Sequence, residues 1–589
     1  MSVEKLITDH IDIWSSALQT RSSAGRGSNG KIDLYGIKKL RELILELAVR
    51  GKLVPQDPND EPASELLKRI AAEKAELVKQ GKIKKQKPLP EISEDEKPFE
   101  LPEGWEWQRL IELGSWAIGS GFPTSIQGIT CEDILMCKVS DMNLQGNEKF
   151  IKVTNNTISE ESAIQRKINV SEPGTVIFPK IGGAIATNKR RILVKKTAID
   201  NNCLGIRPFE RINLEWFFLI LNVIDMAKYQ SGTSMPAINQ SVIGNIVIAL
   251  PSECMQARIV AKVEELMFLC DQLEQRSLTS LDAHQQLVET LLATLTDSQS
   301  AEELAENWAR ISQHFDTLFT TEASIDALKQ TILQLAVMGK LVPQDPNDEP
   351  ASELLKRIEQ EKAQLVKEGK IKKQKPLPAV SEDEKLFEVP DGWEWCKFGS
   401  LAEFINGDRG SNYPNRNEYV EKGIPWINTG HIERNGTLSI GGMHFITQKK
   451  YDELRSGKIT EGDLVYCLRG ATFGKTAFVT PYTEGAIASS LMIVRAHLIE
   501  TNSYIYNYLI SPFGRSQILR FDNGSAQPNL SANSVMLYAF PCPPLAEQLR
   551  ISRRIKLLFE VCDTLKSRLQ STQQTQLHLA DALTDAALN

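Results

Sequence analysis

Positively charged side chains gather in one stretch of an otherwise acidic chain. Between Lys180 and Arg211 the sequence has eight lysines and arginines against two acids, while the whole chain carries a formal net charge of -7. A glycine turn and the polar residues Thr187 and Asn188 lie in the same stretch. Lysine and arginine attract phosphates, and arginine can form paired hydrogen bonds to a guanine edge. The stretch therefore predicts contacts with nucleic acid. The candidate residues are Lys180, Lys189, Arg190, Arg191 and Lys195.

A weaker set of cations occurs in the second half of the chain. A single basic loop is usually only a solvated surface, but two such loops on one chain favour DNA as the ligand. The alternative is a scaffold that joins two proteins without touching DNA. The candidates in the second set are Arg409, Arg416, Arg434, Arg469 and Lys475.

Enzyme motifs are incomplete in this sequence. The run GATFGKT (470–476) resembles a phosphate-binding loop, but that motif needs four residues between its glycines, and Gly470 and Gly474 enclose three. We interpret this run and the corresponding GGAIATN (182–188) as glycine turns between two strands of a hairpin. No Asx-Pro-Pro-aromatic motif for methyl transfer to an amino group is present.

Acids and histidines that could act in catalysis lack partners. The run SEDEK contains the Glu-x-Lys of a nuclease site, but a metal-dependent nuclease needs a further carboxylate on a rigid strand. These acids are expected in a polar connector, so we interpret them as a solvated charge run. His431 and His444 are conceivable catalytic histidines, yet no nucleophile accompanies either. We therefore predict no catalytic residue, no cofactor and no metal in this chain. The alternative of the enzyme class is a fused methyltransferase and nuclease.

The composition is that of an ordinary globular protein. The chain has 589 residues, of which 41% are apolar and 24% charged, enough for several domains. Its nine cysteines form no CxxC pair, so Cys131 and Cys137 are predicted to be buried structural thiols rather than metal ligands. No apolar run approaches the ~20 residues of a membrane span, and the start MSVEKLITDHIDIW does not resemble a signal peptide. We expect a cytoplasmic location.

One segment of the chain occurs twice. Residues 47–107 recur as residues 335–395, 288 positions later, with 10 differences in 61 residues. We interpret the lysines of GKIKKQKPLP as part of a solvated loop, because the acidic SEDEK follows them in both copies. In the first copy these are Lys82, Lys84, Lys85 and Lys87. Trp105 and Trp107, at the end of this copy, are expected to anchor the following region by burying their rings.

Each repeat leads into a region that is much less alike. The two regions share faint landmarks, among them Gly119 with Gly407, and PGTVIF (173–178) with EGDLVY (461–466). Both have short β-rich runs separated by glycine, followed by a late helix. The late helices are expected at 214–229 and about 503–520. We predict one common fold that presents two different surfaces.

Long helices follow both variable regions. Apolar residues at alternating steps of three and four predict two helices of about 44 residues, each a rod of ~65 Å, which most simply pair as an antiparallel coiled coil. Shorter helices are expected at 3–18, 33–49 and 324–337, with Gly51 and Gly339 placed to end the last two. The run SSAGRGSNG (22–30) is expected to be a flexible break.

The predicted fold class is mixed α/β (α+β), with two globular domains separated by long antiparallel coiled-coil helices in a pseudo-twofold internal repeat. The predicted domains are an N-terminal helical region with the first repeat (1–107), a first variable domain (108–250), a central conserved region (251–395), a second variable domain (396–542) and a C-terminal long helix (543–589).

The constant segments resemble a known family. ILELAVRGKLVPQDP (44–58), ILQLAVMGKLVPQDP (332–346) and PPLAEQLRI (543–551) are similar to segments of the specificity subunits of type I restriction-modification enzymes, most closely the EcoAI-like branch, type IB. The first copy of the last motif, PSECMQARI, keeps Gln256 and Arg258 but lacks Leu-Ala-Glu. The resemblance covers nearly the whole chain and is specific in the constant segments.

The resemblance implies that each variable domain is a target recognition domain for one half of a bipartite DNA target, and that the long helices set the spacer. It implies two modification subunits, which bind S-adenosylmethionine and methylate a flipped-out adenine, and restriction subunits, which use ATP and Mg²⁺ to translocate and cut DNA. The constant segments and helices would dock the modification subunits. An orphan specificity subunit without partners is the alternative within this class.

Overall fold

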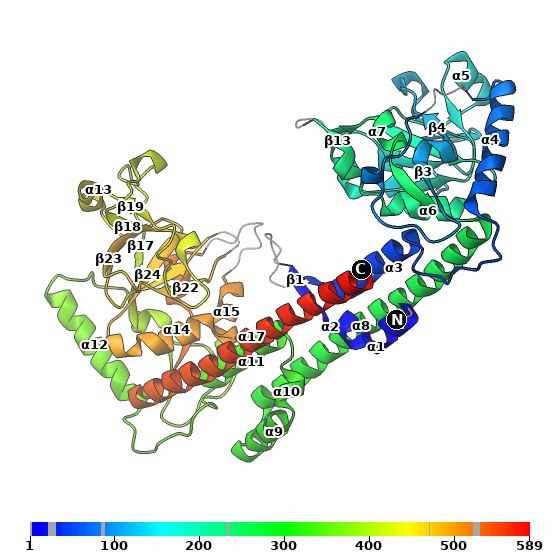
Figure 1. Ribbon diagram of the computed structural model, residues 1–589. Coiled ribbons are helices and arrows are strands. Elements are labelled where there is room, and N and C mark those ends of the chain that lie inside the picture. Colours follow the sequence, from blue (N-terminus) through cyan, green and yellow to red (C-terminus); the bar gives the residue numbers. More distant parts are fainter. Residues whose placement is uncertain are drawn as a thin grey trace. The chain divides into compact units, whose positions relative to one another are not determined.

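A computed structural model describes most of the chain (Figure 1), namely residues 3–21, 31–83, 89–232, 236–469, 472–521 and 530–588. Outside these ranges lie the predicted break at 22–30, Lys84, Lys85, Lys87 and Gly470. The chain forms two compact units, each treated by itself below. The first unit comprises Met1–Thr20, Ile32–Leu278 and Gln573–Asn589, and the second comprises Arg21–Lys31 and Thr279–Thr572.

The first variable region contains two sheets. One has the strand order β4-β12-β9-β10-β6, and the other has the order β7-β5-β11-β8. The strands of the first sheet are β4 (Gly114–Ile118), β12 (Cys203–Pro208), β9 (Val176–Pro179), β10 (Arg191–Leu193) and β6 (Phe150–Ile151). Those of the second are β7 (Asn156–Ile158), β5 (Ile134–Cys137), β11 (Thr197–Ile199) and β8 (Val170–Ser171).

The second variable region repeats this arrangement. Its sheets have the orders β17-β24-β21-β22 and β19-β18-β23-β20. The first contains β17 (Ala402–Asn406), β24 (Leu491–Ala496), β21 (Leu464–Cys467) and β22 (Thr476–Phe478). The second contains β19 (His444–Ile446), β18 (Ile424–Ile427), β23 (Glu484–Ile487) and β20 (Lys458–Thr460). The sequence prediction of one common fold is confirmed.

The two glycine turns lie in equivalent hairpins. β9 pairs antiparallel with β10, and β21 pairs antiparallel with β22, as predicted. Every residue of β9 and β21 is buried, which explains why both read as continuous apolar runs rather than as alternating ones. Gly119 and Gly407 are also equivalent, since a Cβ at either would collide with a backbone carbonyl, that of Asp200 or that of Ala488. Only glycine permits this approach.

Paired strands close each variable region. β3 (Glu106–Arg109) pairs antiparallel with β15 (Val247–Leu250), and β16 (Glu394–Lys397) pairs in the same way with β25 (Ala539–Cys542). The first and last residues of each region therefore lie side by side. Because the two ends of each variable region are adjacent, the sequence between them can change without disturbing the helices to which the region is attached.

The late helices are shorter than the sequence predicts. The helix expected at 214–229 is α6 (Leu214–Val223), followed by a 3₁₀ turn at Met226–Tyr229. The helix expected at about 503–520 is wrong as a single element, because it divides into α14 (Asn502–Ile510) and α15 (Pro512–Leu519). Pro512 opens the second helix, and the Ser511 side chain caps it by accepting from the Gly514 N–H. Proline cannot continue a preceding helix but suits the first turn of a new one.

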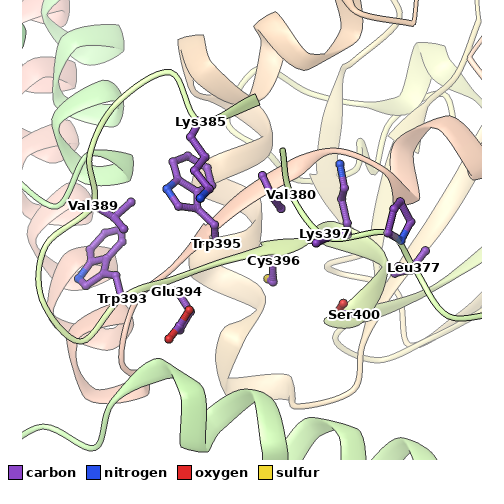
Figure 2. A pocket seen from close by; sticks show the side chains of 12 residues that line it. Leu377, Val380, Lys385, Val389, Trp393, Glu394, Trp395, Cys396, Lys397 and Ser400 are labelled. Atoms are coloured by element: carbon purple, nitrogen blue, oxygen red, sulfur yellow. The ribbon is translucent and has the colours of Figure 1, made fainter. Parts of the chain in front are cut away.

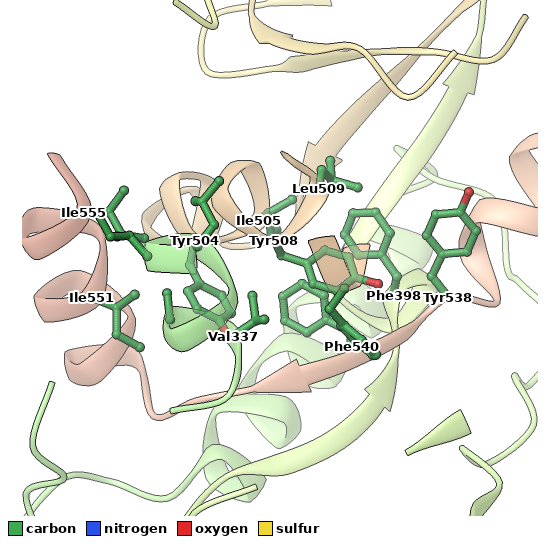
Figure 3. Packing of buried hydrophobic residues seen from close by; sticks show 14 of the residues in the cluster. Val337, Phe398, Tyr504, Ile505, Tyr508, Leu509, Tyr538, Phe540, Ile551 and Ile555 are labelled. Atoms are coloured by element: carbon green, nitrogen blue, oxygen red, sulfur yellow. The ribbon is translucent and has the colours of Figure 1, made fainter. Parts of the chain in front are cut away.

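An aromatic core joins the second variable region to its frame (Figure 3). The rings of Phe398 and Phe540 stack with centroids 5.6 Å apart, and Tyr508 lies 4.5 Å from Phe540. The Tyr508 hydroxyl donates to the Ala539 carbonyl at 2.8 Å, which satisfies its buried polar end. Ile551 of the following long helix belongs to the same buried cluster, so module and frame share one core.

The frame consists of helices. The two long ones have 45 and 44 residues, in agreement with the predicted length of about 44. Gly51 and Gly339 follow the ends of α3 and α11 with φ values of 69° and 72°, as expected for left-handed helix ends. The frame helices are α3 (Tyr35–Val49), α8 (Glu253–Asp297), α11 (Glu322–Val337) and α17 (Leu545–Leu588).

In the first unit, α3 contacts the early part of α8. Arg41 forms an ion pair of 2.6 Å with Asp271, and Arg258 pairs with Asp60, which follows α3. Asp60, beyond the C-terminal end of α3, thus meets a residue earlier along α8 than Arg41 does, which indicates that the two helices run antiparallel.

The same helix α3 contacts the last part of α17. Tyr35 donates to the Asp581 carboxylate at 2.7 Å, and Lys52 Nζ donates to the Leu588 carbonyl at 2.7 Å. These helices run parallel, so α8 and α17 are antiparallel within the unit, as the sequence predicts. The contact through α3 is an addition that the apolar pattern alone does not contain.

The second unit repeats these contacts with the roles of the long helices exchanged. Lys329 of α11 pairs with Asp563 of α17 at 2.5 Å, and Arg550 pairs with Asp348 at 2.6 Å. These four residues occupy the positions of Arg41, Asp271, Arg258 and Asp60 in the repeat. Lys340 Nζ donates to the Thr296 carbonyl at 2.8 Å, as Lys52 does to Leu588. The pseudo-twofold repeat thus extends to individual ion pairs.

Smaller elements complete the chain. The helix expected at 3–18 is divided into α1 and α2, and none of the helices in the described ranges is long and apolar enough to cross a membrane. The remaining helices are α1 (Val3–Asp9), α2 (Ile11–Ser16), α4 (Ala63–Lys79), α5 (Glu160–Gln165), α7 (Gln240–Gly244), α9 (Ala301–Gln313), α10 (Phe315–Leu318), α12 (Ala351–Lys367), α13 (Gln448–Glu453) and α16 (Ala532–Met536). The remaining strands are β1 (Gln19–Arg21), β2 (Lys31–Asp33), β13 (Gln230–Ser231) and β14 (Ala237–Ile238).

Candidate nucleic-acid interface

The basic loop of the first variable region connects β9 to β10. Lys180 is half-buried, and its backbone bonds to Asn202 and Ile238 fix the start of the loop. At Gly182 and Gly183 an added Cβ would meet no atom within 4 Å, so the loop surface is open at this point. An open, glycine-containing loop beside a cation can approach a phosphate backbone closely.

Arg190 does not belong to this open surface, which corrects the prediction for this residue. Its side chain is 2% exposed. The guanidinium donates to the carbonyls of Leu221, at 3.1 Å, and Ile224, at 3.2 Å, and to Asn188 Oδ1 at 2.7 Å. Burial lowers its pKa to about 10. With its donors used inside the protein, Arg190 holds the loop against the end of α6 and cannot reach DNA.

Arg191 is half-buried, and its contact with DNA stays a prediction. It donates to the Arg190 carbonyl at 2.7 Å and to the Met142 carbonyl at 3.0 Å. Burial lowers the pKa of its guanidinium. Arg191 therefore joins the β9–β10 loop to the turn that follows β5.

Two lysines of the first set remain at the surface. Lys189 is partly exposed and donates to Asn143 Oδ1, which lies on the turn after β5. Lys195 is exposed on the turn between β10 and β11, and within the described residues its ammonium has no hydrogen bond or ion pair. Sequence reasoning missed Asn143, although its position shortly after a buried strand is one where loop side chains often act.

The second set of cations is divided among several loops. Arg409, Arg416, Arg434 and Lys475 are exposed, and none forms an ion pair among the residues that the structure describes. Arg469 is half-buried, and its Nε has no partner within the same residues. The structure thus brings Arg469 and Lys475 to one hairpin loop and leaves the other three on separate turns.

His431 and His444, the two candidate histidines, are neighbours. Their ring centroids lie 5.1 Å apart, and His431 is buried, with Nδ1 accepting from the Asn428 N–H at 3.1 Å. Burial, together with the nearby His444, lowers the pKa of His431. A neutral, fully bonded imidazole of this kind holds a loop in place.

One acid of each SEDEK run is held by an ion pair with a strand residue, whereas Glu94 and Asp95 of the first copy are exposed, as expected of a solvated charge run. Glu96 forms an ion pair of 2.9 Å with Arg109, whose guanidinium holds the pKa of the Glu96 carboxyl at about 2. In the second copy Glu384 pairs with Lys397 at 2.6 Å. Each pair fastens the connector to the first strand of a variable region.

Tryptophans anchor both variable regions, as predicted. Trp105 is buried and donates from Nε1 to Gln56 Oε1 at 2.9 Å. Trp107 contacts the ring of Phe99, with centroids 4.9 Å apart. The counterpart of Trp105 in the second unit is Trp393, which donates to Glu547.

A pocket of about 450 Å³ lies beside β16 (Figure 2). Its lining includes Trp393, Trp395, Lys397 and the thiol of Cys396. A hydrogen bond with Cys542, together with burial, raises the pKa of Cys396 well above its ordinary value, so the thiol is protonated and a poor nucleophile. Cys137 is a buried free thiol, as predicted, whereas the free thiol of Cys131 is exposed, which corrects the prediction for that residue. Among the described residues there is no group of three His, Cys, Asp or Glu suited to a metal ion.

Comparisons with known proteins give a consistent result. Residues 390–572 match the type I restriction modification DNA specificity domain. The chain is 52% identical to the type I restriction enzyme EcoEI specificity subunit and 49% identical to the EcoAI specificity subunit, both of Escherichia coli, with 100% of each chain covered.

Two solved structures are also similar in part. The HsdS subunit from Thermoanaerobacter tengcongensis is 18% identical, with a TM-score of 0.38 over 84% of this chain and 98% of that chain. A chain from a study of complex assembly and conformational transition of the type I R-M system is 18% identical, with a TM-score of 0.46 over 84% and 99%. The identities of 52% and 49% over full length decide the family: this chain belongs to the type I restriction enzyme specificity subunits.

Proposed function

We propose that the two variable regions are target recognition domains, each of which reads one half of a bipartite DNA target. One observation carries this proposal: two regions of different sequence have the same strand order, apart from the additional edge strand β6 of the first, and the same hairpin, and near-identical segments hold them. A constant frame with two variable readers suits recognition of two different half-sites. The long helices would set the unread spacer.

The frame is proposed to dock two modification subunits. The ion pairs of Arg41 with Asp271 and of Lys329 with Asp563 are equivalent, so the chain offers two similar helical surfaces to identical partners. Restriction subunits would complete the assembly. S-adenosylmethionine, ATP and Mg²⁺ would bind to those partners, and this chain would direct adenine methylation or cleavage without catalysing either.

The test is to map adenine methylation in cells that express this chain together with its modification subunit. A second strain carries a version in which residues 108–250 come from another family member. We expect a split motif, of which the exchange alters one half. An unsplit motif, or an exchange that alters both halves or neither, would contradict the proposal and favour a scaffold without DNA readers.

A further inference from the structure

An exposed group of polar and aromatic side chains lies beside β18 and β19 of the second variable region (both labelled in Figure 1). His444 is exposed and stacks on the partly exposed Tyr419, with ring centroids 4.9 Å apart and planes inclined by 26°. Asn428, directly after β18, contacts the same histidine at 3.2 Å. Asn428 also caps the turn that follows β18, and Tyr419 packs against the buried cluster around Trp426, whereas the exposed edge of His444 has no structural partner among the described residues.

The buried imidazole of His431 holds this group in position through hydrogen bonds to the backbone. His431 is 5% exposed and accepts the Asn428 N–H at Nδ1, while its Nε2 faces the Gly442 carbonyl at 3.2 Å. A carbonyl can only accept, so Nε2 of His431 carries the proton. The ring thereby joins the end of β18 to the turn before β19 and fixes the positions of Asn428 and His444.

The hydrogen bonds of Asn428 determine the tautomer of His444. Asn428 Oδ1 accepts the Gly430 N–H at 2.9 Å, so the amide nitrogen Nδ2 is the group that faces His444 Nδ1. Because Nδ2 can only donate, His444 Nδ1 is the acceptor and its proton resides on Nε2. Among the described residues nothing accepts a hydrogen bond from this Nε2–H, which is therefore an oriented and unused donor.

The surroundings of this donor suit a DNA groove. Ile440 is 76% exposed, and an added Cβ at Gly441 or Gly442 would meet no atom within 4 Å. Arg416, three positions before Tyr419, and Arg434, three positions after His431, are exposed cations without an ion pair within the described ranges. Arginines beside an open surface can hold phosphates while nearby side chains meet base edges.

The first variable region uses the same framework differently. Asp141 takes the place of His431 and accepts the Lys138 N–H at 2.7 Å. The counterpart of His444 is Asn156, which is 7% exposed and accepts the Gly128 N–H at 2.6 Å. The supporting role is therefore present in both regions, whereas the second region presents an outward donor at a position that the first one buries.

We propose that His444, oriented by Asn428 and stacked on Tyr419, contacts a base in the half-site read by the second variable region. This inference rests on the proposed function. The Nε2–H requires an acceptor, which purine N7, guanine O6 and thymine O4 provide in the major groove, whereas the cytosine edge offers a donor. The contacted base is thus a purine or thymine, and the exposed Ile440 suits a thymine methyl nearby.

The experiment uses the complex of the full chain with its modification subunit. Methylation mapping first defines both half-sites for the wild type, and competition binding then compares duplexes that carry the mapped target with each single base-pair change. The variants are His444→Ala and Tyr419→Ala. The control is Lys449→Ala, an exposed lysine on neighbouring α13. Thermal unfolding of each variant shows whether the fold is preserved.

We expect His444→Ala to lose about 10-fold discrimination at one position of the second half-site, with the first half-site unchanged. Tyr419→Ala should lose discrimination at the same position to a smaller extent, and Lys449→Ala should lose none. Unchanged discrimination at every position of the second half-site would overturn the assignment of His444 while leaving the two-reader function intact. A wild-type motif that is not split would overturn both.

Discussion

Trp393 donates a hydrogen bond of 2.9 Å to the Glu547 carboxylate, and so ties the entrance of the second variable region to the first turn of α17. In the first unit the position of Glu547 holds Met255, and Trp105 donates to the amide oxygen of Gln56 instead. The equivalent Gln344 donates to Glu547 at 2.9 Å. The anchoring hydrogen bond is thus preserved although its acceptor has moved.

This arrangement predicts which substitutions of the anchor are tolerated. Glu547→Gln keeps one acceptor oxygen, for either the Trp393 N–H or the Gln344 amide but not both, and should cost about 1 kcal/mol. Trp393→Phe leaves a buried carboxylate without this donor and should cost about 2 kcal/mol. Denaturant unfolding of both variants and of the double variant measures the coupling. Additive costs would show that the two side chains do not interact.

The same carboxyl predicts a pH dependence. Burial raises the pKa of Glu547 above its ordinary value of 4.5, and the hydrogen bonds from Trp393 and Gln344 oppose that shift only in part. A raised folded-state pKa stabilises the protein at low pH, and this stabilisation is lost as the pH rises through the folded-state value. The melting temperature of the wild type, relative to Glu547→Gln, should therefore fall as the pH rises above about 4.5. A rising difference would mean that this pKa is lowered.

Arg190 is predicted to act through stability. Arg190→Gln leaves the buried carbonyls of Leu221 and Ile224 without their donor and should destabilise the first unit by about 2 to 3 kcal/mol. Lys195→Gln, at an exposed site on the same region, should stay within about 0.5 kcal/mol of the wild type. Unfolding curves decide the matter, and equal stability of the two variants would place Arg190 at the surface.

The salt dependence of DNA binding is expected to separate the surface lysines from the buried Arg190. If Lys189 and Lys195 neutralise phosphates, each change to Gln should lower the slope of log affinity against log salt by about 1. Arg190→Lys, which keeps the charge inside the protein, should leave that slope unaltered. The measurement is a salt titration of DNA binding by the assembled complex. Wild-type slopes in both lysine variants would remove these residues from the interface.

Two lysines at the ends of the long helices provide a matched comparison. Lys340 is half-buried and donates to the carbonyls of Thr296 and Ser298, each at 2.8 Å, whereas the exposed Lys52 donates to Leu588 alone. Lys340→Met should therefore cost about 1 kcal/mol, and Lys52→Met about half of that. Chemical unfolding, followed separately for each unit, measures the two changes in the free energy of unfolding. A larger cost for Lys52→Met than for Lys340→Met would contradict the prediction.

Local pattern predicted the long helices, the hairpins and the tryptophan anchors, because each depends on residues close together in sequence. The three-four spacing is present wherever one face of a helix is buried. Pro512 indicates a break in the late helix. The sequence nevertheless predicts one helix, because the apolar spacing continues across this proline. The helix-ending roles of Gly51 and Gly339 could also be predicted, because each depends only on the helix that ends directly before it.

The site was harder to predict, because the role of a cation depends on partners that sequence spacing does not show. Arg190 and Lys189 are neighbours in sequence. However, the carbonyls of Leu221 and Ile224, which accept hydrogen bonds from the Arg190 guanidinium, lie 31 and 34 residues later in the chain. Likewise, the sequence does not show that Glu96 and Glu384 of the SEDEK runs lie beside Arg109 and Lys397. His444 was recognised only as a possible catalyst, since the tautomer that Asn428 imposes requires coordinates.

The contact between Tyr35 and Asp581 has a consequence for synthesis of the protein. These residues are 546 positions apart, so Asp581 leaves the ribosome roughly half a minute to two minutes after Tyr35 at ~5 to 20 residues per second. Throughout that interval the nascent first unit lacks the helix that completes it. The part of the protein that is translated first is therefore the part that matures last, and premature termination near the end of the message would damage the half that had already emerged.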